Sequence, residues 1–307
     1  MAKEKIAPVR LNKNTMTRKY MLIGLCFMLP AFATYIIFMG YPLARTFQVS
    51  LMRWDGFNPM SFIGLENYRN IIGDTTFWLA LRNTLYFSVV AGIISVFLGL
   101  ILAWFNMHLF RMEGQVFRTV KFSPSMIAPT ITGLLFIFVF SESIGLLNNL
   151  LIVMGLENLT TAWLGNLATV RPAVVVAQVW RQFGFAMVVC YAGLQGVPKE
   201  LIESSRLDGA SDWQIFTRIL IPMIKPQLEI SMMFAMLWGL RIYDSVVSLT
   251  GGGPVRQTIV VPMWIIDNAF GFSRHGYAAA LSVVFILVTF IFILIMRLAF
   301  RGGRHEY

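Results

Sequence analysis

The sequence predicts an all-α integral membrane protein with six transmembrane helices. Hydrophobic residues make up 57% of the 307 residues, charged residues only 13%, and the mean hydropathy is +0.69. Soluble domains contain only about 45–50% apolar residues. Several apolar runs also reach the roughly 20 residues that a helix needs to cross a bilayer. Because backbone polar groups in lipid must be satisfied within the protein, these runs are predicted to be helices.

Six segments form the predicted transmembrane domain, 20–300. The spans are 20–44, 83–107, 120–141, 172–197, 226–249 and 275–298. The fourth and fifth spans qualify only if charges are tolerated, namely Arg181 in the fourth and Arg241 and Asp244 in the fifth. The first run contains Ala31-Phe32-Ala33, which has the A-x-A form of a signal-peptide cleavage site. The run nevertheless stays apolar up to Met39, which favours a transmembrane span that is not cleaved.

The distribution of basic residues predicts the orientation in the membrane. With the N-terminus inside, sixteen Lys and Arg residues fall on the inner side and seven on the outer side. Basic residues concentrate on the cytoplasmic side of membrane proteins. We therefore expect a multi-pass protein of a bacterial or archaeal cell membrane, with cytoplasmic tails at 1–19 and 301–307. The net charge of +10 then reflects topology and implies no nucleic-acid partner.

A polar segment, 198–224, separates the fourth and fifth spans and predicts a helical hairpin on the cytoplasmic side. Pro198 suits a first helical position, and Asp208-Gly209 indicates a turn. Ser211 and Gln214 have the spacing of a capping box that would begin a second helix. Such a hairpin, which exposes apolar side chains beside charges, either docks another protein or packs beneath the helix bundle.

Three shorter elements are predicted in the connections. Residues 67–72 form a short helix, and Leu146–Met154 is an amphipathic segment at the membrane interface. The sequence Thr250-Gly251-Gly252-Gly253-Pro254 cannot continue a helix, because it combines three glycines with a proline.

The sequence contains no grouping of residues typical of a catalytic or metal site. Its three histidines are scattered, and its two cysteines, Cys26 and Cys190, lie in apolar stretches. No phosphate-binding loop of the form G-x-x-x-x-G-K-[ST] is present. We expect neither a metal site nor a cofactor in this chain, and no enzymatic activity.

The hairpin resembles the signature of permease subunits of ABC importers, which is E-A-A, three residues, G, nine residues and I-x-L-P. Glu203, Gly209, Ile219 and Pro222 match its spacing. Ser204-Ser205 replaces the two alanines and Ile221 the leucine, which leaves only the fine docking affinity in question. Further blocks resemble the maltose-transporter-like group of carbohydrate permeases: Phe62–Tyr68, Phe77-Trp78, Arg82–Thr84, Ala192–Gln195, Leu249–Pro254, Ala269-Phe270 and Gly276–Ala280.

The resemblance implies a permease that forms the pathway for a sugar or oligosaccharide. Its partners would be a separate ABC ATPase, which binds ATP and Mg, a second and similar permease in a heterodimer, and an extracytoplasmic sugar-binding protein. The hairpin would be the coupling helix that sits in a groove of the ATPase. The residues implied in ATPase coupling are Glu203, Ser204, Ser205, Asp208, Gly209, Ala210, Phe216, Ile219 and Pro222.

Polar residues within the spans suggest where a substrate passes, because polar groups at membrane depth are costly. Gln178, Arg181, Gln182 and Phe185 share one face of the fourth span by their spacing. In the fifth span a comparable face includes Trp238, Arg241 and Ile242, with Tyr243 and Asp244 beside it. The resemblance adds Gly239 and places the same regions at the sugar contacts. Alternatively, Arg181 or Arg241 pairs with Asp244, and the glutamines bond between helices.

Two other functions are considered. The first is a permease of the same family for another solute, such as glycerol phosphate or a charged saccharide, and Arg181 and Arg241 keep it open. The second is a secondary transporter or channel. A secondary transporter predicts inverted repeats and broken helices that coordinate ions, and it gives no reason for the pattern from Glu203 to Pro222.

Overall fold

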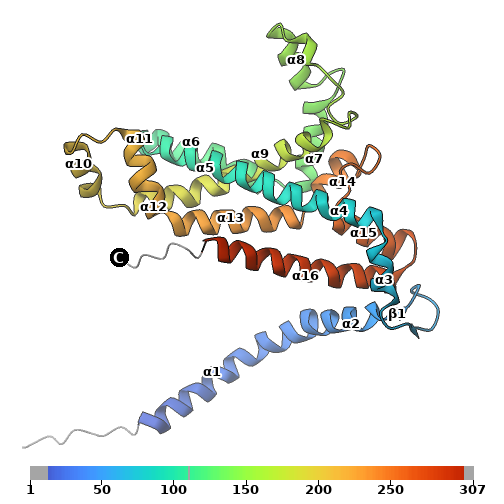
Figure 1. The fold of residues 1–307 in the computed structure, drawn as a ribbon. Coiled ribbons are helices and arrows are strands. Elements are labelled where there is room, and N and C mark those ends of the chain that lie inside the picture. The colour runs from blue at the N-terminus through green and yellow to red at the C-terminus, as the bar shows by residue number, and fades with distance from the viewer. Residues whose placement is uncertain (1–12, 110, 301–307) are drawn as a thin grey trace, which may run out of the picture.

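The computed structural model describes residues 13–109 and 111–300, so most of both predicted tails lies outside the described residues. Four long helices lie side by side along one direction: α5 (Gly92–Asn106), α9 (Val170–Gln195), α13 (Lys225–Leu240) and α16 (His275–Phe300) (Figure 1). The end of α16 and the hairpin lie at the left end of this bundle in Figure 1, and the first described turn of α1 lies at the lower left, apart from the bundle.

Four helical stretches are long and apolar enough to cross a membrane: Ile23–Ser50, Thr75–Asn106, Val170–Gln195 and His275–Phe300. The first runs through α1 (Lys13–Tyr35), a π-helical turn (Ile36–Gly40) and α2 (Tyr41–Ser50). The second runs through α4 (Thr75–Tyr86), a π-helical turn (Phe87–Ala91) and α5. Two bent helix pairs bring the number of spans to six if each pair is counted as one, which agrees with the predicted number.

The first bent pair differs in shape from the predicted span 120–141. Helix α6 (Arg111–Phe122) continues into a 3₁₀ turn (Ser123–Met126), and α7 (Pro129–Phe140) then leaves at an angle of 101°. Ile127 and Ala128 between them are extended. The residue before a proline is disfavoured in the helical region, so Pro129 favours an extended Ala128 and suits the first position of α7.

The second bent pair differs in shape from the predicted span 226–249, because only its second helix, α13, overlaps that range. The short helix α11 (Asp212–Ile215) continues through a π-helical turn (Phe216–Leu220) and α12 (Ile221–Met223), and α13 follows at 73°. Helix α13 ends at Leu240, three residues are not helical, and α14 (Asp244–Thr250) then packs against α7. The predicted fifth span is therefore interrupted at Arg241–Tyr243.

The peripheral elements agree with the predicted connections. Helix α3 (Glu66–Ile72) and α8 (Leu146–Val153) form as expected, and α14 ends at Thr250 before Gly251 and Gly252, whose φ angles are positive. The remaining elements are β1 (Met52–Arg53) paired antiparallel with β2 (Ser61–Phe62), a 3₁₀ turn (Glu157–Leu159), α10 (Lys199–Leu207), α15 (Val261–Ile266) and a π-helical turn (Asp267–Gly271).

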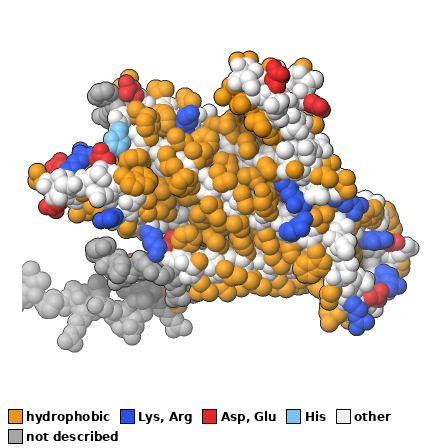
Figure 2. Space-filling view, turned by 45° about the horizontal axis from the view of Figure 1, so that its top comes forward, with side chains coloured by type: hydrophobic (Ala, Val, Ile, Leu, Met, Phe, Trp, Pro, Cys, Tyr) orange, Lys and Arg blue, Asp and Glu red, His pale blue; other side chains and the backbone are white. Residues whose placement is uncertain are grey.

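The surface view shows hydrophobic side chains over the middle of the molecule and charged side chains mainly towards its two ends (Figure 2). This distribution suits a protein whose middle lies in lipid and whose ends meet water. Inside the bundle, Gly99 of α5 lets α9 approach closely, because a Cβ atom there would lie 2.7 Å from the backbone nitrogen of Met187. Small residues allow such close contact between helices in membranes.

Asp74 connects the start of the second span to the last span. Its Oδ1 accepts hydrogen bonds from the backbone N–H groups of Thr76 and Phe77, which caps α4. Its Oδ2 accepts from Trp264 Nε1 at 2.8 Å and from the Tyr277 hydroxyl at 2.7 Å. This cap explains why the helix begins at Thr75, eight residues before the predicted span.

Asp74→Ala is therefore expected to destabilise the chain by about 3 kcal/mol, because it removes a helix cap and the partner of two side-chain donors. A thermal unfolding assay in detergent should show a midpoint lower by about 5 °C or more. Asp267→Ala removes an exposed carboxylate at the same end and serves as the control. Equal midpoints for the two variants would contradict the role assigned to Asp74.

Candidate functional site

The first helix of the hairpin, α10 (Lys199–Leu207), ends in a glycine-dependent turn. Gly209 has a φ of 82°, in the left-handed region. The N–H of Gly209 donates to the carbonyl of Arg206, and the N–H of Ala210 donates to that of Ser205, each at 3.0 Å. This pair of bonds is the Schellman motif, in which glycine is strongly preferred. Gly209 therefore fixes the direction in which the chain returns.

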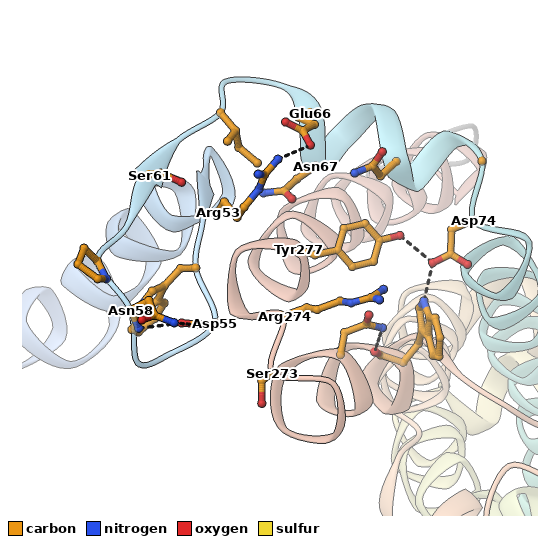
Figure 3. Close-up of a pocket in the computed structure, with 17 residues that line it drawn as sticks. Arg53, Asp55, Asn58, Ser61, Glu66, Asn67, Asp74, Ser273, Arg274 and Tyr277 are labelled. Atoms are coloured by element: carbon orange, nitrogen blue, oxygen red, sulfur yellow. Dashed lines mark hydrogen bonds and ion pairs between the residues drawn. The ribbon is translucent and has the colours of Figure 1, made fainter.

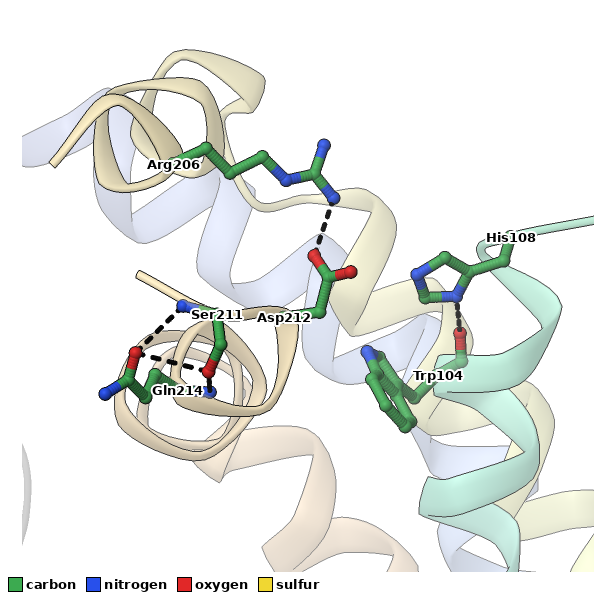
Figure 4. A network of polar contacts seen from close by, with 6 residues as sticks. All are labelled: Trp104, His108, Arg206, Ser211, Asp212 and Gln214. Atoms are coloured by element: carbon green, nitrogen blue, oxygen red, sulfur yellow. Dashed lines mark hydrogen bonds and ion pairs between the residues drawn. The ribbon is translucent and has the colours of Figure 1, made fainter. Parts of the chain in front are cut away.

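The second helix begins with the predicted capping box, which the structure confirms. The Ser211 side chain accepts from the backbone N–H of Gln214, and the Gln214 side chain accepts from the backbone N–H of Ser211 at 2.8 Å (Figure 4). Arg206 and Asp212 form an ion pair of 2.9 Å across the turn. Both side chains are more than half exposed, so this pair contributes little to stability. The caps, rather than the ion pair, define the hairpin.

Buried aromatic packing fixes the second helix to the bundle. Phe216 is buried and stacks on Trp104 of α5, with ring centroids 4.6 Å apart. Ile215 and Leu220 are also buried, in a cluster shared with Leu194 at the end of α9. Of the predicted coupling residues, Phe216 thus packs inside this chain, and Ile219 lies beside the same cluster. A force applied to the hairpin would reach α5 and α9 through these contacts.

The first helix, in contrast, has no buried residue and stands away from the bundle (Figure 1). Glu203, Ser204, Asp208 and Gly209 are exposed on it and on the turn that follows. Leu207, the last helical residue, is 89% exposed, which is unusual for a leucine outside lipid. Trp213 is 63% exposed on the facing helix. Leu207 and Trp213 were absent from the predicted coupling set, because periodicity alone assigns apolar residues to the inner face.

The polar residues of α9 are buried within the bundle. Gln178 is 3% and Gln182 2% exposed, and neither the amide nitrogen nor the amide oxygen of Gln182 has a hydrogen-bond partner. Arg181 is partly exposed, and its Nε also lacks a partner. Unsatisfied polar groups at this depth are costly, so a water molecule, a substrate or a neighbouring subunit is expected to supply the missing partners.

Aromatic side chains of α9 and α13 meet beside these residues. Phe185 packs edge-to-face against Trp238 with ring centroids 5.0 Å apart, and against Phe234 at 5.6 Å. All three rings are partly or largely exposed. The structure therefore brings together Phe185 and Trp238, which the sequence assigned to two separate spans. Such a partly open aromatic surface can stack on the apolar face of a sugar ring.

The break after α13 separates the other predicted pathway residues into two groups. Arg241 and Asp244 are exposed and Tyr243 is partly exposed, whereas Ile242 is buried. Gly239 is also buried, and a Cβ atom there would lie 2.3 Å from Cα of Ser88 in the second span. Gly239 and Ile242 thus serve the packing of this chain. Among the described residues, Asp244 forms no ion pair with Arg181 or Arg241.

The geometry is that of a helical bundle with a hairpin whose second helix packs against it. The sequence pattern of one family matches the chain over residues 95–304. That family is the binding-protein-dependent transport system inner membrane component. The chain belongs to this family. This membership confirms the prediction that the chain is a transport subunit in the cell membrane. It also decides against the alternatives of an enzyme, a secondary transporter or a channel.

Relatives in the same transport family cover nearly the whole chain. A probable ABC transporter permease protein, YurN of Bacillus subtilis, is 33% identical over 95% of this chain and 100% of its own length. The lactose transport system permease protein LacF of Rhizobium radiobacter is 31% identical over 90% and 93%. The trehalose/maltose transport system permease protein MalF of Thermococcus litoralis is 30% identical over 87% and 90%.

Solved structures of ABC transporters share the fold. A bacterial ABC transporter for import of the acidic polysaccharide alginate has a chain that aligns with a TM-score of 0.80 and 22% identity, over 95% of this chain and 99% of that one. A chain of the MetNI methionine ABC transporter aligns with a TM-score of 0.55 and 14% identity, over 78% and 99%. At these identities the likeness establishes the fold of the permease family and no substrate.

Proposed function

We propose that this chain is the carbohydrate-translocating permease subunit of an ATP-driven importer. The observation that carries the proposal is the near full-length similarity to permeases named for lactose and for trehalose/maltose. The aromatic surface of Phe185 and Trp238 beside the buried amides Gln178 and Gln182 suits a sugar, which offers both apolar ring faces and hydroxyl groups.

The hairpin couples this chain to a separate ATPase. Glu203, Leu207 and Trp213 are exposed at its tip and provide the contact surface, while the buried Phe216 transmits movement to α5. ATP and Mg are bound by the ATPase subunits rather than by this chain. Both termini are cytoplasmic in this proposal, which is supported by the hairpin, the described end of α16 and the start of α1 all lying towards the left of Figure 1.

The assembly includes a second, homologous permease and an extracytoplasmic binding protein. The partly exposed Arg181 and the exposed Arg241 and Asp244 then face a pathway that the two permeases enclose. The dependence on a binding protein is the defining property of the family. Co-purification of the tagged chain with an ATPase and a second permease tests this composition.

Replacing Arg181 or Gln182 by alanine is expected to reduce sugar uptake at least tenfold, because each side chain carries a polar atom without a partner in this chain. Uptake of labelled lactose, trehalose and maltose by cells that express the importer measures the effect. Gln195→Ala, which alters an exposed amide near the end of the same helix, is the matched control. Normal uptake in both variants, with normal amounts of protein, would remove these residues from the pathway.

A second candidate substrate class is a charged solute, such as glycerol phosphate or an acidic saccharide. Two arginines, Arg181 and Arg241, favour it, because neither is neutralised by an ion pair among the described residues. Uptake of labelled glycerol phosphate, without uptake of labelled lactose, trehalose or maltose, would select this alternative.

A further inference from the structure

A polar pocket opens at the end of the molecule opposite the hairpin. It has a volume of about 780 Å³ and lies between the loop after the first span and the start of the last span (Figure 3). One wall is formed by the segment from Arg53 to Asp74, and the other by the segment from Trp264 to Tyr277. The pocket is far in sequence from the predicted pathway residues, none of which lines it.

The wall of the pocket is held rigidly. Asn67 is buried, and its Nδ2 donates to the carbonyls of Ser50 and Met52. Asp74 joins the two walls through its bonds to Trp264 and Tyr277 (Figure 3). A pocket with walls fixed by side-chain hydrogen bonds is preorganised and loses little entropy when a ligand binds.

Two groups that border this pocket lack polar partners. Asn268 is fully buried, its Nδ2 donates to the carbonyl of Trp264, and its Oδ1 accepts nothing. The Arg274 side chain extends alongside the ring of Tyr277, and it has no ion-pair partner among the described residues (Figure 3). A ligand here is therefore expected to accept from Arg274, whereas the Asn268 oxygen has no accessible surface and can be reached only by an internal water molecule.

The charges around the pocket favour a neutral ligand. Three carboxylates, Asp55, Glu66 and Asp74, line it with two arginines, Arg53 and Arg274, and Arg53 is paired with Glu66 at 2.8 Å. Backbone N–H groups of Asn58 and then of Phe57 bond to Asp55 and lower its pKa to about 2, so it is ionised at neutral pH. Excess negative charge disfavours an anion, whereas a hydroxyl group can donate to Oε2 of Glu66, since Arg53 bonds only to its Oε1.

Aromatic side chains complete the lining. Trp54, Trp264 and Tyr277 border the pocket together with four amide side chains: Asn58, Asn67, Asn70 and Asn268. Aromatic faces beside planar amide and carboxylate groups match the alternating apolar faces and hydroxyl edges of a saccharide. We propose that this pocket is an outer binding site for a neutral saccharide, separate from the translocation pathway. This inference rests on the proposed carbohydrate function.

A photoreactive aryl-azide derivative of maltose tests the site on the assembled importer in lipid nanodiscs without binding protein. After illumination, mass spectrometry should find label in peptides that contain 53–74 or 264–277, and unmodified maltose, trehalose or lactose should compete with it. Arg274→Gln removes the unpaired donor. It should raise the concentration of unmodified sugar that is needed to displace the label about tenfold. Arg69→Gln changes an exposed arginine on α3 that does not line the pocket, so it should leave competition unchanged.

Several results would overturn the outer site. They are label confined to peptides of α9 and α13, label that none of the three sugars displaces, and equal effects of Arg274→Gln and Arg69→Gln. Uptake of the same sugars by the wild-type importer is measured in parallel. Uptake without label at the pocket contradicts only the outer site, whereas absence of uptake for all saccharides contradicts the proposed function itself.

Discussion

Leu207→Lys is expected to reduce sugar uptake at least about tenfold by releasing the ATPase from the complex. Leu207 is 89% exposed at the end of α10, where no neighbour within the chain covers it. If this side chain enters an apolar pocket of the ATPase, a buried ammonium group there is strongly unfavourable. The fold itself should be spared, because the position is exposed and a lysine near a helix C-terminus is favourable.

The measurement is the amount of ATPase that co-purifies with a tagged permease, together with uptake of a labelled sugar. Leu207→Met retains an apolar side chain of similar size and is the matched control, expected to behave as wild type. Thermal unfolding of the isolated chain should be the same for both variants. Full retention of the ATPase by Leu207→Lys would show that the tip of the hairpin is not the contact.

Gly239→Val is expected to abolish accumulation of folded protein. A Cβ atom at this position would lie 2.3 Å from Cα and 3.0 Å from the backbone nitrogen of Ser88, and backbone atoms cannot move aside as a flexible side chain can. The hydrogen bond from the Ser88 hydroxyl to the carbonyl of Met236, at 2.7 Å, would be lost when the helices separate. Overpacking and loss of a buried hydrogen bond together cost several kcal/mol, roughly 3–5.

Detergent-solubilised yield and size-exclusion profile measure this effect. Gly24→Val is the matched control, since nothing lies within 4 Å of a Cβ atom at Gly24 in α1. The control should be produced at the wild-type level. If Gly239→Val were equally abundant but failed in uptake, Gly239 would belong to the pathway, as its position in the sequence first suggested.

Much of the fold follows from simple features of the sequence. Apolar runs of sufficient length, four without charges and two with a few charges, predicted the number of spans. The pair Ser211 and Gln214 predicted the capping box that begins the second hairpin helix. Both features are local: they depend on residues that are neighbours along the chain. The turn at Gly209 is also a local feature, because its φ of 82° depends on the neighbouring residues of the turn and not on distant contacts.

The break in the third span could not be predicted from hydropathy, because the apolar character continues through it, whereas the break in the fifth span coincides with the charged residues Arg241 and Asp244. Ile127 and Ala128 are apolar, yet they are extended before Pro129. The break at Arg241–Tyr243 has no proline or glycine, and Tyr243 takes φ −133° and ψ −65° where α14 turns to pack against α7. This break depends on contacts between helices that are distant in sequence.

Helical spacing alone did not predict which of the candidate pathway residues are buried within the chain. Gln178 and Gln182 were assigned to a polar face, and both are buried, whereas Gly239 and Ile242 belong to the packing of the chain. Helical spacing shows which residues share a face, but it does not show which neighbouring helix covers that face. The exposed Leu207 went unnoticed for the same reason.

ATP-driven accumulation in proteoliposomes tests the central claim that the hairpin couples this chain to an ATPase for sugar import. The complete importer is reconstituted with the binding protein and labelled sugar on one side and ATP on the other. The wild-type complex should concentrate the sugar against its gradient, and the complex with Leu207→Lys should not. Equal accumulation by both complexes, or accumulation that persists when the ATPase subunit is left out, would contradict the claim.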